Sequence, residues 1–142
     1  MRALLIFLMF LCCSTTLQNN PIITAHTKSY RLWYDLDKHV PVLVMWKMYN
    51  GGGSFPRSVF YFKTAPGSAT NKDFVKMGYD KGHMADAQDF AYDSTRMSET
   101  FTYYNVAPQT PQLNRGVWKT YESRSRTTSK TDSLLIACGS IY

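Results

Sequence analysis

The chain has 142 residues, of which 44% are hydrophobic and 18% charged. This balance is typical of a single folded domain and excludes an intrinsically disordered chain. The formal net charge is +6, which favours an anionic partner such as a nucleic acid, with a merely solvated basic face as the alternative. Five of the basic residues lie in residues 114–130, where Glu122 is the single acidic residue.

The first part of the chain, residues 1–17, has the pattern of a secretory signal peptide. Arg2 supplies a positive charge, and the apolar run of residues 3–11 is too short to cross a bilayer as a permanent helix. Cleavage is expected between residues 12 and 20, and an uncleaved anchor is the alternative. The pattern predicts a secreted protein, extracellular or periplasmic, with no membrane contact once the signal is cleaved.

Cysteine usage indicates a fold without disulfide bonds. If Cys12 and Cys13 leave with the signal peptide, the mature chain retains Cys138 alone. A single thiol has neither a disulfide partner nor companion cysteines for a zinc site. Cys138 lies in an apolar run, so we expect a buried structural thiol.

The next segments alternate between polar and β-rich stretches. Residues 18–38 are polar and weakly patterned, which predicts a lead-in segment before a domain at residues 39–142. Residues 40–49 are β-rich and apolar and predict a strand. A glycine-rich turn follows at residues 50–54, and residues 58–63 predict a second strand.

The second half of the chain predicts two further strands and a helix. Residues 102–106 are expected to form a short strand that Pro108 ends. A helix is predicted from about residue 113 to residue 126, because Val117, Trp118 and Tyr121 follow an apolar helical spacing. Residues 134–137 predict a final buried strand.

The most informative part of the sequence is a set of polar motifs at fixed spacing. They are Tyr79-Asp80-Lys81-Gly82-His83-Met84-Ala85-Asp86-Ala87-Gln88-Asp89-Phe90, Asn105-Val106-Ala107-Pro108-Gln109, Leu113-Asn114-Arg115-Gly116-Val117-Trp118-Lys119, and Glu122. In this order they resemble the active site of the DNA/RNA non-specific endonucleases of the ββα-metal, DRGH type. The resemblance is specific over residues 78–126 and diffuse back to Val40.

This resemblance implies both a fold and an activity. The implied fold is α+β, with an antiparallel sheet and a β-hairpin and helix that present a histidine and a metal-binding asparagine to each other. Members of the family usually continue well past the strand that corresponds to residues 134–137, so this chain looks shortened at its C-terminus. The implied activity is Mg²⁺-dependent cleavage of DNA and RNA with little sequence preference, giving 5′-phosphate products. Mn²⁺ would suit the same oxygen ligands.

His83 and Asn114 are the residues on which this chemistry depends. An imidazole titrates near neutrality, so His83 is the expected general base that deprotonates the attacking water. Asn114 is the expected metal ligand, because Mg²⁺ keeps most of its waters and needs few protein oxygens. The alternative role for Asn114 is that of a helix N-cap.

Further residues are expected to support the reaction. Glu122 follows Asn114 by eight residues, which in an α-helix is a rise of about 12 Å. Glu122 is expected to orient water molecules bound to the metal ion; the alternative is a surface ion pair with Arg126. Arg126 is expected to link Glu122 to the phosphate. Asn105 is expected to contact the phosphate or position the histidine, and Gln109 to hold its loop.

The remaining expectations concern positive charge and its placement. Lys81 stands where the family most often has arginine, and so offers a point charge in place of a two-pronged donor. Asp80 is expected to orient its turn or the Lys81 ammonium group. Arg57, Arg115 and Lys119 are the expected substrate-binding residues.

Three functions are compatible with these motifs. The first is a secreted nuclease that hydrolyses DNA and RNA. The second is a catalytically impaired or truncated family member that binds nucleic acid without cutting it. The third is a structural or interaction protein. Each of the three functions is compatible with a homodimer.

Overall fold

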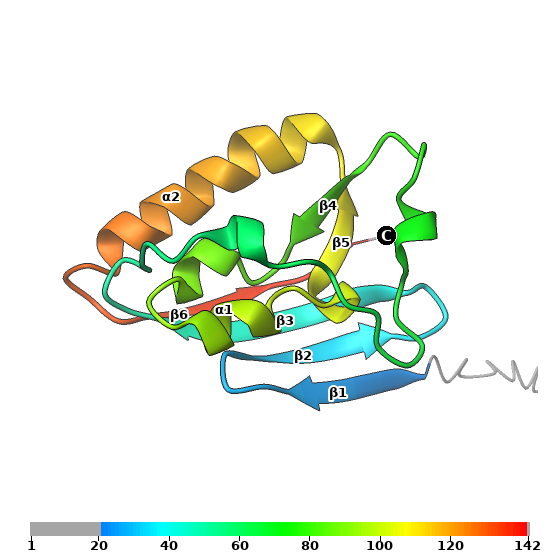
Figure 1. The fold of residues 1–142 in the computed structure, drawn as a ribbon, viewed down its shortest axis with the longest axis horizontal. Helices are drawn as coiled ribbons and strands as arrows, with labels where there is room; N and C mark the ends of the chain where they lie inside the picture. The colour runs from blue at the N-terminus through cyan, green and yellow to red at the C-terminus, as the bar shows by residue number, and fades with distance from the viewer. Residues whose placement is uncertain (1–20, 142) are drawn as a thin grey trace, which may run out of the picture.

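A computed structural model of the protein describes residues 21–141. The segment interpreted as a signal peptide lies outside these residues. A four-stranded antiparallel sheet has the order β1-β2-β3-β6, and a separate two-stranded sheet pairs β4 with β5 (Figure 1). The strands are β1 (Ile22–His26), β2 (Tyr30–Asp35), β3 (Val40–Met48), β4 (Asp80–His83), β5 (Val106–Gln109) and β6 (Leu134–Cys138). The antiparallel α+β class expected from the sequence is therefore confirmed.

The helical segments are mostly short. The α-helices are α1 (Ser94–Glu99) and α2 (Lys119–Thr128), and a π-helix, η5 (Leu113–Trp118), leads directly into α2. Within residues 21–141, four 3₁₀ turns complete the set, at η1 (Arg57–Val59), η2 (Asn71–Asp73), η3 (Ala87–Phe90) and η4 (Tyr103–Asn105). Among the described residues, no helix is long and apolar enough to cross a membrane.

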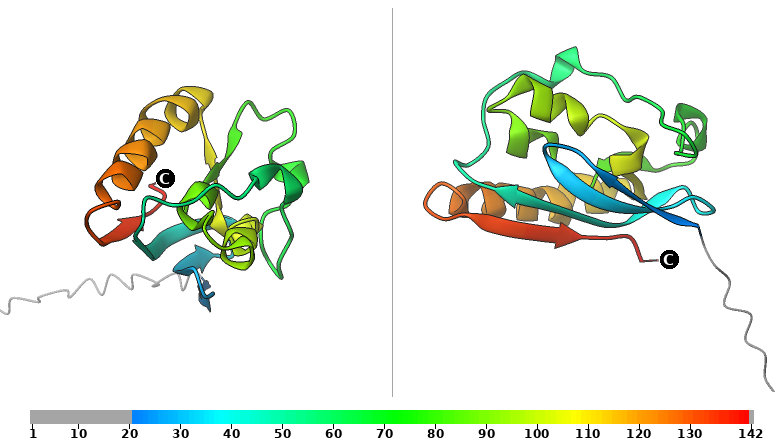
Figure 2. Two further views of the ribbon diagram at one scale, coloured as in Figure 1. Left: turned by 60° about the vertical axis from the view of Figure 1, so that its left-hand side comes forward. Right: turned by 90° about the horizontal axis from the view of Figure 1, so that it is seen from below.

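The large sheet packs one face against the rest of the domain. Side chains alternate along β2 and β3: Leu32 and Val44 are buried, while Arg31 and Lys47 on the opposite face are exposed. Both α-helices and the β4–β5 pair lie over the buried face (Figures 1 and 2). Tyr30 contributes to this packing by donating a hydrogen bond from its hydroxyl to the Glu99 carbonyl at the end of α1 (2.7 Å).

The segment predicted as an irregular lead-in is instead part of the sheet from Ile22 onward. The hairpin of β1 and β2 pairs Ile22 with Asp35 and His26 with Arg31, and β2 in turn pairs with β3. The interpretation of residues 22–38 as a lead-in is therefore wrong. Their period-two pattern is weak because β1 is an edge strand whose side chains are at most half-buried.

The prediction of a strand at residues 58–63 is also wrong. The segment forms η1 and then an extended stretch whose single β-bridge joins Lys63 to Thr102. Phe62 is half-buried and Tyr61 is 81% exposed, so the segment shows a strand-like alternation of burial. It reflects the packing of Phe60 and Phe62 against Phe101, with ring centroids 5.4 and 5.3 Å apart.

Other predicted elements are present with changed bounds or surroundings. The strand expected at residues 40–49 is β3, whereas most of residues 102–106 form η4, and the strand begins at Val106. The last predicted strand is present as β6, but it is not fully buried: it lies at the edge of the sheet, and Leu135 is 72% exposed. Cys138 is half-buried in β6, and burial raises the pKa of its thiol to about 12, which fits a structural role.

The glycine-rich turn brings the end of β3 against η3. A β-carbon on Gly53 would lie 2.2 Å from the Ala91 backbone, and one on Gly52, which has a φ of +80°, would lie 2.4 Å from the Gln88 carbonyl oxygen. Only glycine permits this approach. The turn thus packs against the segment that follows His83.

Candidate active site

A polar pocket of about 480 Å³ opens between β4, the segment that follows it, and the start of the η5–α2 helix. It is lined by Arg57, Lys81, His83, Asp86, Gln88, Asn114, Arg115, Lys119, Glu122 and Arg126. All the residues predicted for the site are in this list except Asn105. The structure thus brings together side chains from segments far apart in the sequence, and their chemical roles stay predictions.

His83 forms the inner wall of the pocket. It is the last residue of β4, and its ring lies 4.9 Å from the ring of Phe62 and 5.0 Å from that of Phe101. Nε2 is buried and has no hydrogen-bond partner among the described residues. Burial, opposed by the negative charge of Asp86, lowers the pKa of His83 to about 4. The imidazole is therefore neutral near pH 7 and can accept a proton.

Asp80 fixes the orientation of Asn114. Its Oδ2 atom accepts hydrogen bonds from Asn114 Nδ2 (2.9 Å) and Arg115 Nε (2.8 Å), and its Oδ1 atom accepts one from an Arg115 guanidinium nitrogen (2.6 Å). These bonds hold the pKa of Asp80 below its usual range. Because an ionised carboxylate only accepts, it must face the amide nitrogen, which leaves the amide oxygen of Asn114 free to bind a cation.

Lys81 points away from Asp80. Its ammonium group donates a hydrogen bond to Asn71 Oδ1 (2.5 Å) and lies 5.6 Å from the ring centroids of Phe62 and Tyr103. The expectation that Asp80 orients either its turn or Lys81 is therefore replaced by its contacts to Asn114 and Arg115. Asn71 and the two rings, which the sequence analysis did not include, position the Lys81 charge.

The helix that carries Asn114 begins differently from the prediction. Residues 111–112 are already helical, and Thr110 Oγ1, ahead of them, accepts a hydrogen bond from the Leu113 amide (3.3 Å). Asn114 therefore lies inside the helix, and its N-cap alternative is excluded. Residues Leu113–Trp118 then form a π-helix before α2 starts at Lys119. The rise from Asn114 to Glu122 therefore differs from that of a regular α-helix. Such π segments are often found at functional sites.

A cluster of carboxylates surrounds Arg126. The guanidinium group donates hydrogen bonds to Asp86 and to Asp89 Oδ1 (3.0 Å), and Trp46 Nε1 donates to Asp89 Oδ2 (3.0 Å). Neither Asp86 nor Asp89 was assigned a role from the sequence, although both lie within the motif that contains His83. Arg126 therefore neutralises buried carboxylates, and its link between Glu122 and the phosphate stays a prediction.

Glu122 lies next to this carboxylate cluster. Burial and the negative charge of Asp86 raise the pKa of Glu122 to about 7. The same two causes raise the pKa of Asp89 to about 7. A cation in the pocket would favour the ionised form of Glu122. Asp86 and Glu122 thus place carboxylate oxygens on one side of the pocket, where a positive ion could lie near them.

The pocket offers oxygen atoms to a metal ion, but few of them. In residues 21–141 no group of three or more histidine, cysteine, aspartate or glutamate side chains is arranged to hold an ion. The amide oxygen of Asn114, oriented by Asp80, is nevertheless free, and Asp86 and Glu122 line the same pocket. These donors fit a hydrated Mg²⁺ ion that takes one protein oxygen and completes its shell with waters and phosphate oxygens.

Asn105 does not line the pocket. Its side chain is fully buried: Oδ1 accepts from the Ala85 amide (2.9 Å), and Nδ2 donates to the carbonyls of Ala85 (2.9 Å) and Thr100 (3.1 Å). Its predicted contact with the phosphate is therefore wrong. Two of the three bonds hold the chain at Ala85, two residues after His83, which fits the alternative expectation that Asn105 is a positioning residue.

Replacing Asn105 by alanine should lower the free energy of unfolding by roughly 3 kcal/mol, because three buried backbone groups lose their partner. Urea unfolding of the variant, beside a control replacement of the exposed Gln112, measures this. A variant of native stability would show that these three bonds do not hold the fold.

The remaining predicted residues differ in how firmly they are held. Gln109 is buried and packs against Gly82. A β-carbon added to Gly82 would lie 2.3 Å from the side-chain carbonyl carbon of Gln109, which agrees with a structural role for Gln109. Arg57 lies on η1 with its guanidinium carbon 5.9 Å from the Phe101 ring centroid. Arg115 is paired with Asp80 but its side chain is 71% exposed, and Lys119 is exposed beside it.

Comparison with known proteins agrees with this geometry. Residues 14–142 match the profile of the family described as DNA/RNA non-specific endonuclease. The chain is 39% identical over 70 residues to mitochondrial endonuclease G of Bos taurus, covering 49% of this chain and 23% of that protein. It is 34% identical over 109 residues to the mitochondrial nuclease EXOG of Xenopus laevis, covering 72% of this chain and 30% of that protein.

A solved structure shows the same fold. The chain is similar to a chain in the crystal structure of the EndoG/EndoGI complex, with a TM-score of 0.78 and 30% sequence identity over 84% of this chain and 53% of that one. This chain is thus shorter than these relatives, spanning less than a third of the two curated proteins and about half of the structural one. The sequence motifs, the fold and the profile agree, and the chain belongs to the DNA/RNA non-specific endonuclease family.

Proposed function

We propose that the protein is a Mg²⁺-dependent endonuclease that hydrolyses phosphodiester bonds of DNA and RNA. The observation that carries the proposal is that His83 and Asn114, from β4 and η5, line the same pocket. The positive charge of Arg57, Lys81, Arg115 and Lys119 at this pocket supports an anionic substrate. The N-terminal pattern further supports secretion, to the medium or the periplasm.

In this proposal His83 acts as the general base. The neutral imidazole takes a proton from a water molecule as the water attacks phosphorus. Phe62 and Phe101 hold the ring in place, so the base stays aligned with the attacking water. A pKa of about 4 makes His83 a weak base toward ordinary water.

Asn114 would hold the metal ion, with Asp80 setting the direction of its oxygen. When bound, Mg²⁺ acidifies water and neutralises charge on the phosphate, and Mn²⁺ would serve the same ligands. Glu122 accepts hydrogen bonds from water on the same side of the pocket. Lys81 and Arg57 stabilise the charge that builds up on the phosphate oxygens.

Incubation of the full chain with supercoiled plasmid and with RNA, in Mg²⁺ or in EDTA, tests the proposal. The expected result is cleavage of both substrates in Mg²⁺ and none in EDTA. Salt-sensitive DNA binding without cleavage in either buffer would reject the nuclease and indicate the non-cutting nucleic-acid binder. Absence of both binding and cleavage would leave the structural or interaction protein.

A further inference from the structure

A second groove, of about 660 Å³, runs along the outer face of the η5–α2 helix, next to the pocket. Its cations are Arg115, Lys119 and Arg124. No carboxylate and no apolar side chain lines it; the other lining residues are glycine, serine and threonine. This composition suits an anionic ligand and disfavours a membrane or an apolar peptide.

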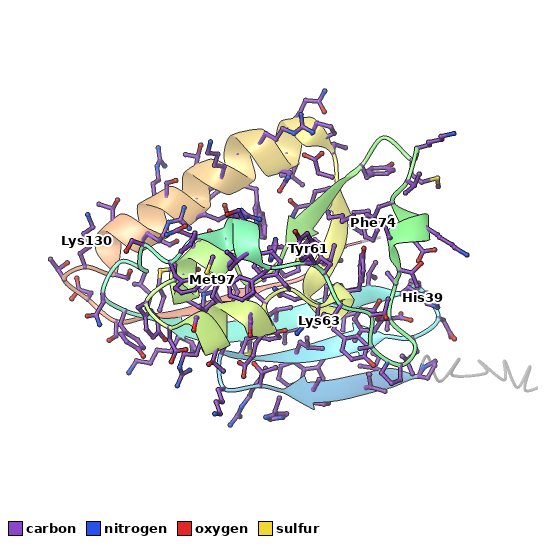
Figure 3. The ribbon with its side chains drawn as sticks, viewed as in Figure 1. His39, Tyr61, Lys63, Phe74, Met97 and Lys130 are labelled. Carbon is purple, nitrogen blue, oxygen red and sulfur yellow. The ribbon has the colours of Figure 1, made fainter. Side chains whose placement is uncertain are left out.

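The groove is continuous with the pocket. Arg115 and Lys119 line both, so their side chains form the border between the two. From Lys119 to Thr128, where the groove ends, α2 rises about 13 Å. An anionic chain whose reacting group lay in the pocket could therefore extend over this border and along α2. Lys130 lies beyond the end of α2, away from β4 and β5 (Figure 3).

Two of the three cations of the groove, Lys119 and Arg124, are available to a ligand, whereas Arg115 is paired with Asp80. Within residues 21–141, Lys119 and Arg124 form no ion pair, and both are exposed. The neighbouring hydroxyls are less available, because Thr120 donates to the Gly116 carbonyl (3.1 Å) and Thr127 to the Ser123 carbonyl (3.0 Å). The charged side chains are therefore the main groups that the groove offers to an anion.

We propose that this groove binds the sugar-phosphate backbone of the nucleic-acid strand beyond the bond that is cut, with Arg124 contacting a phosphate outside the pocket. The proposal rests on the proposed function for the position of the cut bond. It assigns Arg124 a role in holding long substrates and none in the chemical step. A minimal phosphodiester that fills only the pocket does not reach Arg124.

Arg124→Gln tests the proposal, since glutamine keeps the helix propensity and removes the charge. The matched control is Arg31→Gln, which removes the same charge from the exposed face of the large sheet. Binding of a labelled single-stranded oligonucleotide is measured in EDTA over a range of salt concentrations. Loss of one phosphate contact should reduce the slope of log K against log salt by about 0.7. Arg31→Gln should leave this slope unchanged.

Cleavage then separates this proposal from the proposed function. Arg124→Gln should raise KM for a long oligonucleotide and leave the hydrolysis of bis-p-nitrophenyl phosphate unchanged. An unaltered salt slope in Arg124→Gln, or an equal reduction in Arg31→Gln, would overturn the groove assignment whether or not the protein cuts. A reduced slope confined to Arg124→Gln, in a protein that cuts nothing, would support the groove and reject the nuclease.

Discussion

Replacing His83 by alanine should lower the rate of DNA and RNA cleavage by about 10²- to 10⁴-fold, the usual contribution of a positioned general base. Nucleic-acid binding should persist, because the cations that line the pocket are untouched. Single-turnover cleavage of an oligonucleotide at saturating protein measures the chemical step. The exposed His26, on β1, is the control position, where alanine should have no effect.

A second variant separates loss of the base from loss of the fold. His83→Phe keeps an aromatic ring between Phe62 and Phe101 and removes the buried nitrogen that has no partner among the described residues. It should therefore unfold at a urea concentration no lower than the parent does, yet cut no faster than His83→Ala. Turnover at the parent rate in either variant would refute His83 as the base.

Replacing Asp80 by asparagine should reduce cleavage by about 10- to 100-fold, the range for residues that orient a metal ligand. The neutral amide no longer pairs with Arg115, and its own NH₂ group competes with that of Asn114 for an acceptor. Asn114 would then lose its fixed orientation. Because metal binding is weakened, the variant should need a higher Mg²⁺ concentration to reach half of its maximal cleavage rate. Titration of Mg²⁺ at saturating substrate measures this concentration.

Asp132 provides the control for this experiment. It lies in the exposed turn before β6, outside the pocket, so Asp132→Asn should leave the Mg²⁺ dependence unchanged. If Asp80→Asn had the Mg²⁺ dependence of the parent, the contact between Asp80 and Asn114 would not orient a metal ligand.

The elements that the sequence predicted well are those with strong local signals. The apolar β-branched run of β3 and the glycine-rich turn after it were both expected, and so were β6 and a helix over residues 113–126, which the structure divides into η5 and α2. The β1–β2 hairpin was missed because its outer strand is only half-buried, and η1 was mistaken for a strand. In both segments, packing against distant aromatic or sheet residues decides the structure, and no window of sequence contains those contacts.

The sequence by itself determined the family motif, the candidate base and the candidate metal ligand, because each lies in a motif whose residue types and spacing the chemistry requires. Only the tertiary structure decided which groups support them. Asp80 reaches Asn114 across 34 positions, Arg126 pairs with carboxylates 40 and 37 positions away, and Asn105 bonds to the backbone after His83 rather than to a phosphate. Such partners are set by the packing of β4, η3 and α2 together, and hydrogen bonds and buried charges have to be satisfied within that packing.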